Sequence, residues 1–131
     1  MSVEEYSTVF QLVSVIEGDV PASTPRTAAL AKSLPPGSMT GAPKKRSCQL
    51  IRQLEGAESA RGLYSGVIGY MDVGGGGDFS VVIRSAFKWA GEEVWRVGAG
   101  GAVTALSEPV AEWEEMLTKR QSLLDVLLAS P

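Results

Sequence analysis

The sequence predicts an α+β fold, an antiparallel sheet flanked by helices on one side, and three observations favour it. Segments rich in β-branched residues and bounded by glycine recur between residues 9 and 97. Residues 109–128 carry apolar side chains at helical spacing. Fifteen glycines against seven prolines favour tight turns over a helical bundle. With 131 residues, 44% hydrophobic and 21% charged, the chain is expected to form a single domain over residues 1–131.

The first third of the chain is expected to contain one strand and one helix. Residues 9–16 are β-branched and end at a Glu-Gly-Asp turn, which favours a strand, with a helix as the alternative. Ser23 or Thr24 before Pro25 gives an N-cap followed by proline in the first turn of a helix. This helix is expected to end at residue 33, because Pro35 disfavours helical backbone at the residue before it.

The remaining elements are expected to be two helices and three strands. A loop of small residues from 37 to 44 leads into a helix that ends before Gly56. This helix is expected to turn Cys48 and Ile51 inward, with Leu50 and Leu54 as further candidates for the same face. Residues 63–70 are expected to form a strand whose glycines mark bulges or allow a close approach to the backbone. Residues 79–87 and 93–97 are expected to form a hairpin. The apolar residues of the last helix are Trp113, Met116, Leu117, Leu124 and Leu127.

The composition excludes several classes of protein. A net charge of -3 and a pI near 5.0 argue against nucleic acid as a partner, although Lys44, Lys45 and Arg46 form a local basic cluster. The absence of histidine excludes Ser-His-Asp and Cys-His catalysis, so any metal is expected to be hard and bound by carboxylates. One cysteine, no signal-like segment after Met1 and no apolar run near the ~20 residues of a membrane span predict a cytoplasmic protein that does not contact a membrane.

Two glutamates on the predicted last helix are candidate metal ligands. Glu112 and Glu115 are three residues apart, so both carboxylates project from one helix face and could flank a magnesium ion. The alternative is a solvated helix face on which Glu115 and Lys119 form an i,i+4 ion pair.

Two glycine-containing segments and two single residues are candidate ligand contacts. Residues 37–44 combine the hydroxyls of Ser38 and Thr40 with a glycine turn before a helix, which suits an anion or an oxygen-rich ring, but their spacing is not that of a Walker loop. Residues 98–103 fail as a dinucleotide fingerprint, which leaves backbone N–H groups for a carboxylate or a simple turn. Arg84 in an apolar strand, like Tyr64, either has a structural role or binds a carboxylate.

Five segments, taken in order, resemble the C-terminal part of the chorismate-utilising enzymes. This family includes anthranilate synthase component I, aminodeoxychorismate synthase component I and isochorismate synthase. The resemblance runs from about Val9 to Leu127 and implies the C-terminal portion of an anthranilate synthase component I-like, chorismate-binding fold. The segments are Pro36-Gly-Ser-Met-Thr-Gly-Ala-Pro-Lys44, Arg61-Gly-Leu-Tyr-Ser-Gly-Val-Ile-Gly-Tyr70, Val82-Ile-Arg-Ser85, Gly98-Ala-Gly-Gly101 and Glu112-Trp-Glu-Glu-Met-Leu-Thr-Lys119.

The resemblance implies a role for each candidate residue. Tyr64 and Arg84 would hold the enolpyruvyl carboxylate of chorismate, while Ser38 would contact the ring side. The backbone at Gly98 and Gly100 would line the ligand. The magnesium ligands would be Glu112 and Glu115, with Lys119 near the ring carboxylate. No redox cofactor is expected.

Within the family, the segment around Ser38 resembles the aminodeoxychorismate branch. It implies a transferase activity that converts chorismate and ammonia to 4-amino-4-deoxychorismate for para-aminobenzoate and folate synthesis, with the ammonia supplied by a glutamine amidotransferase domain or subunit. An anthranilate synthase or isochorismate synthase segment is the alternative. Gln11 in place of a family histidine weakens the anthranilate alternative.

Several family features have no counterpart in this sequence. The other magnesium carboxylates and the lysine that attacks the ring are expected in a missing N-terminal portion before residue 1, and Lys44 belongs to a different motif. Residues 102–107 also depart from the family pattern. No catalytic residue is therefore assigned, and weak or absent chorismate binding by the isolated chain is expected. A non-catalytic truncated remnant is the remaining alternative.

Overall fold

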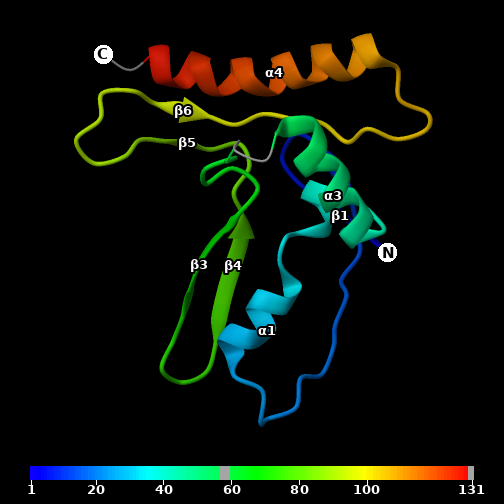
Figure 1. Cartoon of the computed structure of the whole chain (residues 1–131), viewed down its shortest axis with the longest axis vertical. Helices are drawn as coiled ribbons and strands as arrows, with labels where there is room; N and C mark the ends of the chain where they lie inside the picture. The colour runs from blue at the N-terminus through cyan, green and yellow to red at the C-terminus, as the bar shows by residue number, and fades with distance from the viewer. Residues whose placement is uncertain (57–59, 130–131) are drawn as a thin grey trace. The chain divides into compact units, whose positions relative to one another are not determined.

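The computed structural model describes residues 1–56 and 60–129 and divides the chain into two units, Met1–Ser33 and Leu34–Pro131 (Figure 1). The first unit holds the antiparallel hairpin of β1 (Ser2–Glu5) and β2 (Phe10–Val13) and helix α1 (Arg26–Ser33). The predicted strand over residues 9–16 is confirmed at its centre, whereas β1 was not predicted. Pro25 was expected in the first turn of this helix. Helix α1 begins only after Pro25, whose carbonyl accepts hydrogen bonds from the amides of Ala28 and Ala29.

The second unit contains three helices and two short hairpins. Helices α2 (Gly37–Thr40) and α3 (Lys44–Glu55) come first, and α4 (Pro109–Leu128) comes last. Strands β3 (Val67–Met71) and β4 (Gly77–Val81) form one antiparallel pair, and β5 (Ala86–Phe87) and β6 (Arg96–Val97) form another. The α+β class is confirmed. In the described residues, however, the strands form three two-stranded sheets and not the one expected sheet.

The glycines of β3 permit a close approach of backbone, as their pattern predicted. An added Cβ at Gly69 would lie 2.0 Å from the carbonyl oxygen of Asp78 on β4, so only glycine fits this register. The predicted strand over residues 63–70 begins only at Val67, because residues before it close a turn through a hydrogen bond from Gly66 N to the carbonyl of Leu63. Tyr64 therefore lies in a turn.

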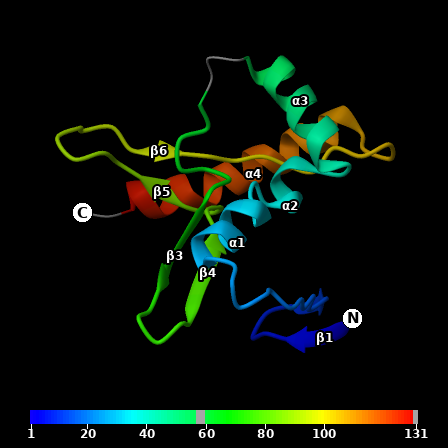
Figure 2. The same ribbon diagram turned by 60° about the horizontal axis from the view of Figure 1, so that its bottom comes forward.

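The helix expected over residues 109–128 is confirmed with those bounds, and α3 likewise ends before Gly56. Pro109 is at the first position of α4, where its missing N–H leaves no intrahelical donor unpaired. In Figures 1 and 2, α4 runs alongside the segment that follows β6. The half-buried residues of α4 are Glu112, Met116, Leu117, Lys119, Leu123, Leu124 and Leu127. Of the five apolar residues expected for this helix, only Trp113 is exposed, at 61%. One face of α4 thus presents both apolar and ionised groups.

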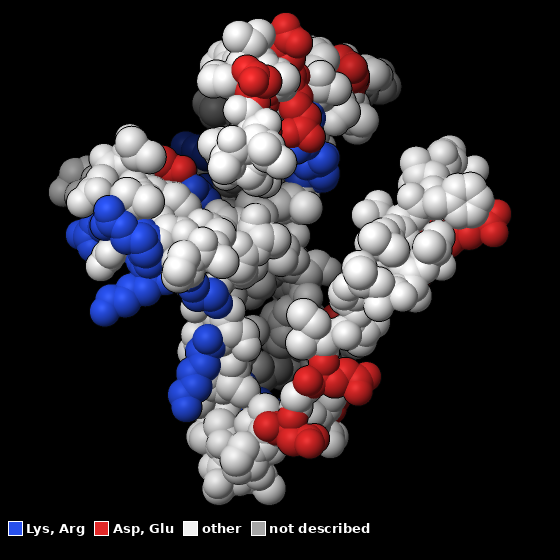
Figure 3. All heavy atoms as spheres, turned by 90° about the vertical axis from the view of Figure 1, so that its right-hand side faces the viewer, with Lys and Arg blue, Asp and Glu red and all other residues white. Residues whose placement is uncertain are grey.

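None of the described residues is fully buried, and the accessible surface is 10650 Å². Large apolar side chains are exposed in both units, among them Phe10 at 73% and Leu54 at 85%. Figure 3 shows broad uncharged areas between the acidic and basic groups on one face. Exposed apolar side chains favour association with other protein surfaces in water. Among the described residues, no helix is long and apolar enough to cross a membrane.

Candidate functional site

A pocket of about 650 Å³ in the second unit collects the candidate ligand contacts. Its walls come from α2, the end of α3, the turn before β3, the segment after β4, the segment after β6, and α4. This volume suits a small organic ligand. All six residues expected to contact substrate line the pocket: Ser38, Tyr64, Arg84, Gly98, Gly100 and Lys119.

The glycines after β6 make room for the side chain of Tyr64. An added Cβ at Gly98 would lie 2.2 Å from Cγ of Tyr64, and one at Gly100 would lie 2.9 Å from the Tyr64 hydroxyl oxygen. Any larger residue at these positions would displace the ring. The sequence suggested that residues 98–103 either bind a carboxylate through backbone N–H groups or form a simple turn. Neither interpretation included this packing against Tyr64.

Arg84 lies between β4 and β5 in a left-handed backbone conformation, with φ 49°. The strand predicted over residues 79–87 is therefore wrong at its centre, because β4 ends at Val81 and β5 begins only at Ala86. The side chain of Arg84 is exposed at the pocket, and none of the described carboxylates forms an ion pair with it. Its guanidinium is available to a carboxylate ligand, for which its paired N–H groups are well arranged.

The two candidate metal ligands converge beside Gly101. An added Cβ at Gly101 would lie 2.9 Å from Oε2 of Glu112 and 3.2 Å from Oε2 of Glu115. Both carboxylates therefore reach one small space next to the pocket wall. The described residues contain no group of three or more acidic, cysteine or histidine side chains suited to a metal. Two carboxylates match the hard oxygen donors of magnesium, which commonly takes its remaining ligands from water and substrate.

Each glutamate also has a protein partner. Lys119 Nζ lies 2.9 Å from Glu115 Oε1 and 3.5 Å from the carbonyl oxygen of Gly100, and its side chain is 19% exposed. The i,i+4 ion pair considered from the sequence is therefore present, and the same lysine lines the pocket. The Ser107 hydroxyl donates a hydrogen bond of 2.6 Å to Glu112 Oε1. This serine lies in the segment that departs from the family pattern, and the sequence did not indicate its role.

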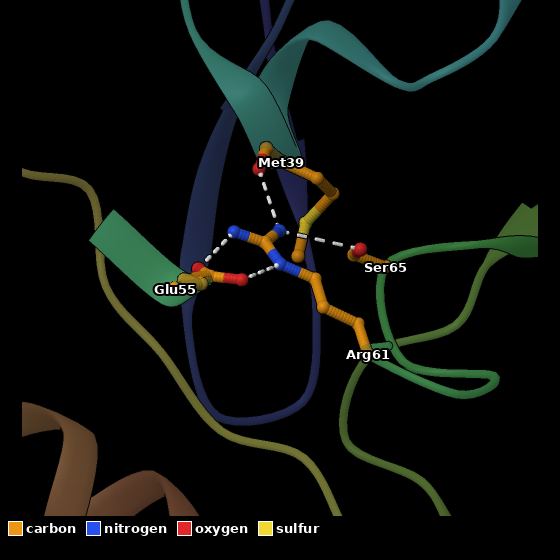
Figure 4. A network of polar contacts seen from close by, with 4 residues as sticks. All are labelled: Met39, Glu55, Arg61 and Ser65. Carbon is orange, nitrogen blue, oxygen red and sulfur yellow. Dashed lines mark hydrogen bonds and ion pairs between the residues drawn. The ribbon is translucent and has the colours of Figure 1, made fainter. Parts of the chain in front are cut away.

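Arg61, which was not among the candidates from the sequence, also lines the pocket. Arg61 forms a bidentate ion pair with Glu55 at the end of α3 and also donates to the Met39 carbonyl and the Ser65 hydroxyl (Figure 4). The hydrogen bonds that Arg61 donates to Glu55 lower the pKa of this carboxyl group below its usual range, and the carboxylate in turn raises the pKa of Arg61. Arg61 belongs to a segment quoted above, but no sequence spacing links it to Glu55 or Met39.

A family model described as chorismate binding enzyme matches residues 1–125. The chain belongs to this family. The resemblance drawn from the five segments is thereby confirmed.

Curated relatives extend along almost the whole chain. The aminodeoxychorismate synthase of Streptomyces pristinaespiralis is 48% identical over 125 residues, which cover 95% of this chain and 17% of the relative. That of Saccharomyces cerevisiae is 44% identical over 141 residues, with 98% and 18% covered. Anthranilate synthase component 1 of Mycolicibacterium smegmatis is 37% identical over 128 residues, with 98% and 24% covered. No solved structure gives a significant match. This member of the chorismate-binding family spans less than a quarter of the length of these relatives.

Proposed function

We propose that the chain forms the carboxylate-binding side of the chorismate site of an aminodeoxychorismate synthase. The observation that carries this proposal is the convergence of Tyr64, Arg84 and Lys119 on one pocket lined by the backbone of Gly98 and Gly100. Chorismate carries two carboxylates, so its site requires cationic groups and backbone donors at two points. The similarity to curated aminodeoxychorismate synthases supports this branch over the anthranilate branch.

The side chains at the pocket have distinct tasks in this proposal. Arg84, which forms no ion pair with the described carboxylates, binds the enolpyruvyl carboxylate together with the Tyr64 hydroxyl. Gly98 and Gly100 leave the space that the tyrosine side chain occupies. Lys119 lines the same pocket as Arg84 and binds the ring carboxylate, the second carboxylate of chorismate. Ser38 contacts the ring from the α2 side. These contacts orient chorismate so that its 4-position faces an incoming amine.

Glu112 and Glu115 are the proposed magnesium ligands, directly or through water. Their convergence beside Gly101 and their oxygen donors fit this ion. When bound, magnesium acts as a Lewis acid that stabilises charge while the 4-hydroxyl group departs. The role of Ser107 is to orient Glu112, and that of Lys119 is to hold Glu115 on the pocket side of α4.

The finer fold and the partners also belong to this proposal. We infer that the chain is the C-terminal portion of an anthranilate synthase component I-like catalytic domain. The nucleophilic lysine and the further carboxylates come from another part of that domain, and ammonia comes from a glutamine amidotransferase. The exposed apolar surface of this chain supports such an arrangement, because the rest of the domain would cover it.

Complementation tests the proposal directly. The 131-residue chain is mixed with the Streptomyces pristinaespiralis enzyme from which the matched segment has been deleted, a combination hereafter called the complemented mixture. With chorismate, ammonia and magnesium, the mixture is expected to form 4-amino-4-deoxychorismate, identified by chromatography. Anthranilate or isochorismate as product would reassign the branch. If no product formed although circular dichroism showed both components to be folded, the result would support the remnant alternative and reject the proposal.

A further inference from the structure

The guanidinium of Arg61 joins three segments that border the pocket. Its Nε and Nη2 donate to Glu55 at 2.8 Å and 2.5 Å, and its Nη1 donates to the Met39 carbonyl oxygen at 3.1 Å and to the Ser65 hydroxyl at 3.3 Å. Figure 4 shows these partners arranged around the end of one side chain. One residue thus connects the end of α3, α2 and the turn before β3.

Each connection is adjacent to a candidate substrate contact. Met39 follows Ser38 in α2, and Ser65 follows Tyr64 in the turn. Ser65 has a left-handed backbone, with φ 67°, and its amide donates to the Val82 carbonyl at 3.0 Å. This conformation is unfavourable for a residue with a Cβ and persists only when the surroundings hold it. The Arg61 hydrogen bonds therefore link the residue after Ser38 to the residue after Tyr64.

Arg61 also lines the pocket, but its capacity to bind a carboxylate is already used. Glu55 occupies the paired N–H groups in the bidentate arrangement that a substrate carboxylate would require. Arg84 differs in this respect, because no described carboxylate pairs with it. The two arginines at the pocket therefore have different roles.

We propose that Arg61 is a positioning residue of the chorismate site. Anchored by Glu55, it acts through Met39 and Ser65 to hold the neighbouring Ser38 and Tyr64 in their binding geometry. This inference rests on the proposed function for the identity of the ligand. The positioning of Tyr64 by the ion pair of Arg61 and Glu55 does not depend on which ligand the pocket binds.

Kinetics in the complemented mixture test the effect on binding. Arg61→Lys retains the charge but loses the bidentate arrangement, and Glu55→Gln removes the partner charge. Each is expected to raise KM for chorismate about tenfold with a smaller change in kcat, because ground-state and transition-state binding weaken together. The double variant is expected to be no worse than either single variant. Arg46→Lys, on the exposed face of α3, is the matched control and is expected to change neither constant.

The opposite pattern would overturn the inference. If Arg61 contacted the substrate itself, Glu55→Gln would leave KM unchanged or lower it by freeing the guanidinium, and Arg61→Lys would act alone. A loss confined to kcat would also contradict a positioning role in binding.

A second measurement does not depend on activity. The chain contains three tyrosines, Tyr6, Tyr64 and Tyr70, so 3-fluorotyrosine labelling gives three fluorine NMR signals, with that of Tyr64 assigned by Tyr64→Phe. Arg61→Lys and Glu55→Gln are expected to shift the Tyr64 signal, while Arg46→Lys is not. Spectra are recorded on the chain alone and in the complemented mixture, with circular dichroism as the folding control. An unmoved Tyr64 signal in folded Arg61→Lys protein would reject the inference even if the mixture made product, and a shifted signal would support it even if no product formed.

Discussion

The ring of Tyr64 lies directly against the backbone of Gly98, where an added Cβ would come within 2.2 Å of the tyrosine Cγ. This contact joins the turn before β3 to the segment after β6. Both segments are among the five that resemble the chorismate-utilising enzymes. Their contact gives a physical reason for a glycine at position 98.

Gly98→Ala is expected to displace Tyr64 and lower kcat/KM for chorismate about a hundredfold in the complemented mixture, since small misplacements of binding groups have effects of this order. Steady-state kinetics measure the loss. Gly18→Ala is the matched control, because an added Cβ at Gly18 meets nothing within 4 Å. Once Tyr64 is replaced by alanine, adding Gly98→Ala is expected to cause no further loss. Two additive losses would show that the glycine acts by another route.

The left-handed backbone of Arg84 predicts a difference between two variants that both remove the guanidinium. Both Arg84→Gly and Arg84→Ala are expected to abolish chorismate binding in the complemented mixture. Glycine tolerates φ 49° without steric cost, so the glycine variant is expected to be more stable than the alanine variant by about 1 kcal/mol. Urea denaturation of the two variants measures this difference. Equal stability would mean that the backbone at position 84 relaxes in the variants.

The sequence predicted the elements that depend on local signals. Proline at position 109 and the helical spacing after it defined α4, and Gly56 marked the end of α3. Local patterns could not predict where β4 ends. The apolar run through Val82 and Ile83 continues the strand pattern, but β4 ends at Val81 and Arg84 adopts a left-handed conformation. That break depends on contacts with other segments, which a single strand pattern does not contain.

Site residues divide in the same way. The glutamates of α4 were indicated by helical spacing, because i,i+3 positions share a face, and the structure brings both beside Gly101. The contact between Arg61 and the Met39 carbonyl spans 22 residues, and no periodicity reports a contact of that range. Ser107 was overlooked for a different reason. Its segment departs from the family pattern, so the resemblance assigned it no role, yet its hydroxyl holds Glu112.

The pair of carboxylates on α4 predicts that activity depends on magnesium and that replacing one carboxylate weakens magnesium binding. Glu115→Gln is expected to raise the magnesium concentration needed for half-maximal activity at least about tenfold, because it removes one of the two proposed anionic oxygen ligands and the partner of Lys119. Magnesium titration of the complemented mixture measures this concentration. Glu114→Gln, exposed on the same helix, is the matched control and is expected to behave as the unaltered chain. An unchanged midpoint for Glu115→Gln would exclude this residue as a ligand.

The ion pair of Glu55 predicts how stability responds to acid. Hydrogen bonds from Arg61 lower the pKa of Glu55 in the folded chain, so the pair stabilises the fold fully above the ordinary carboxyl pKa, and this stabilisation is lost as the pH falls through the lowered value. The urea midpoint of the unaltered chain is therefore expected to exceed that of Glu55→Gln by a constant amount near neutral pH, and this gap is expected to close below about pH 4. The gap is expected to be small, because the Glu55 side chain is 42% exposed and solvent screens the pair. Denaturation curves between pH 3 and pH 7 measure the gap, and a gap of the same size at both ends of this range would contradict the assignment of the lowered pKa to the Arg61 contact.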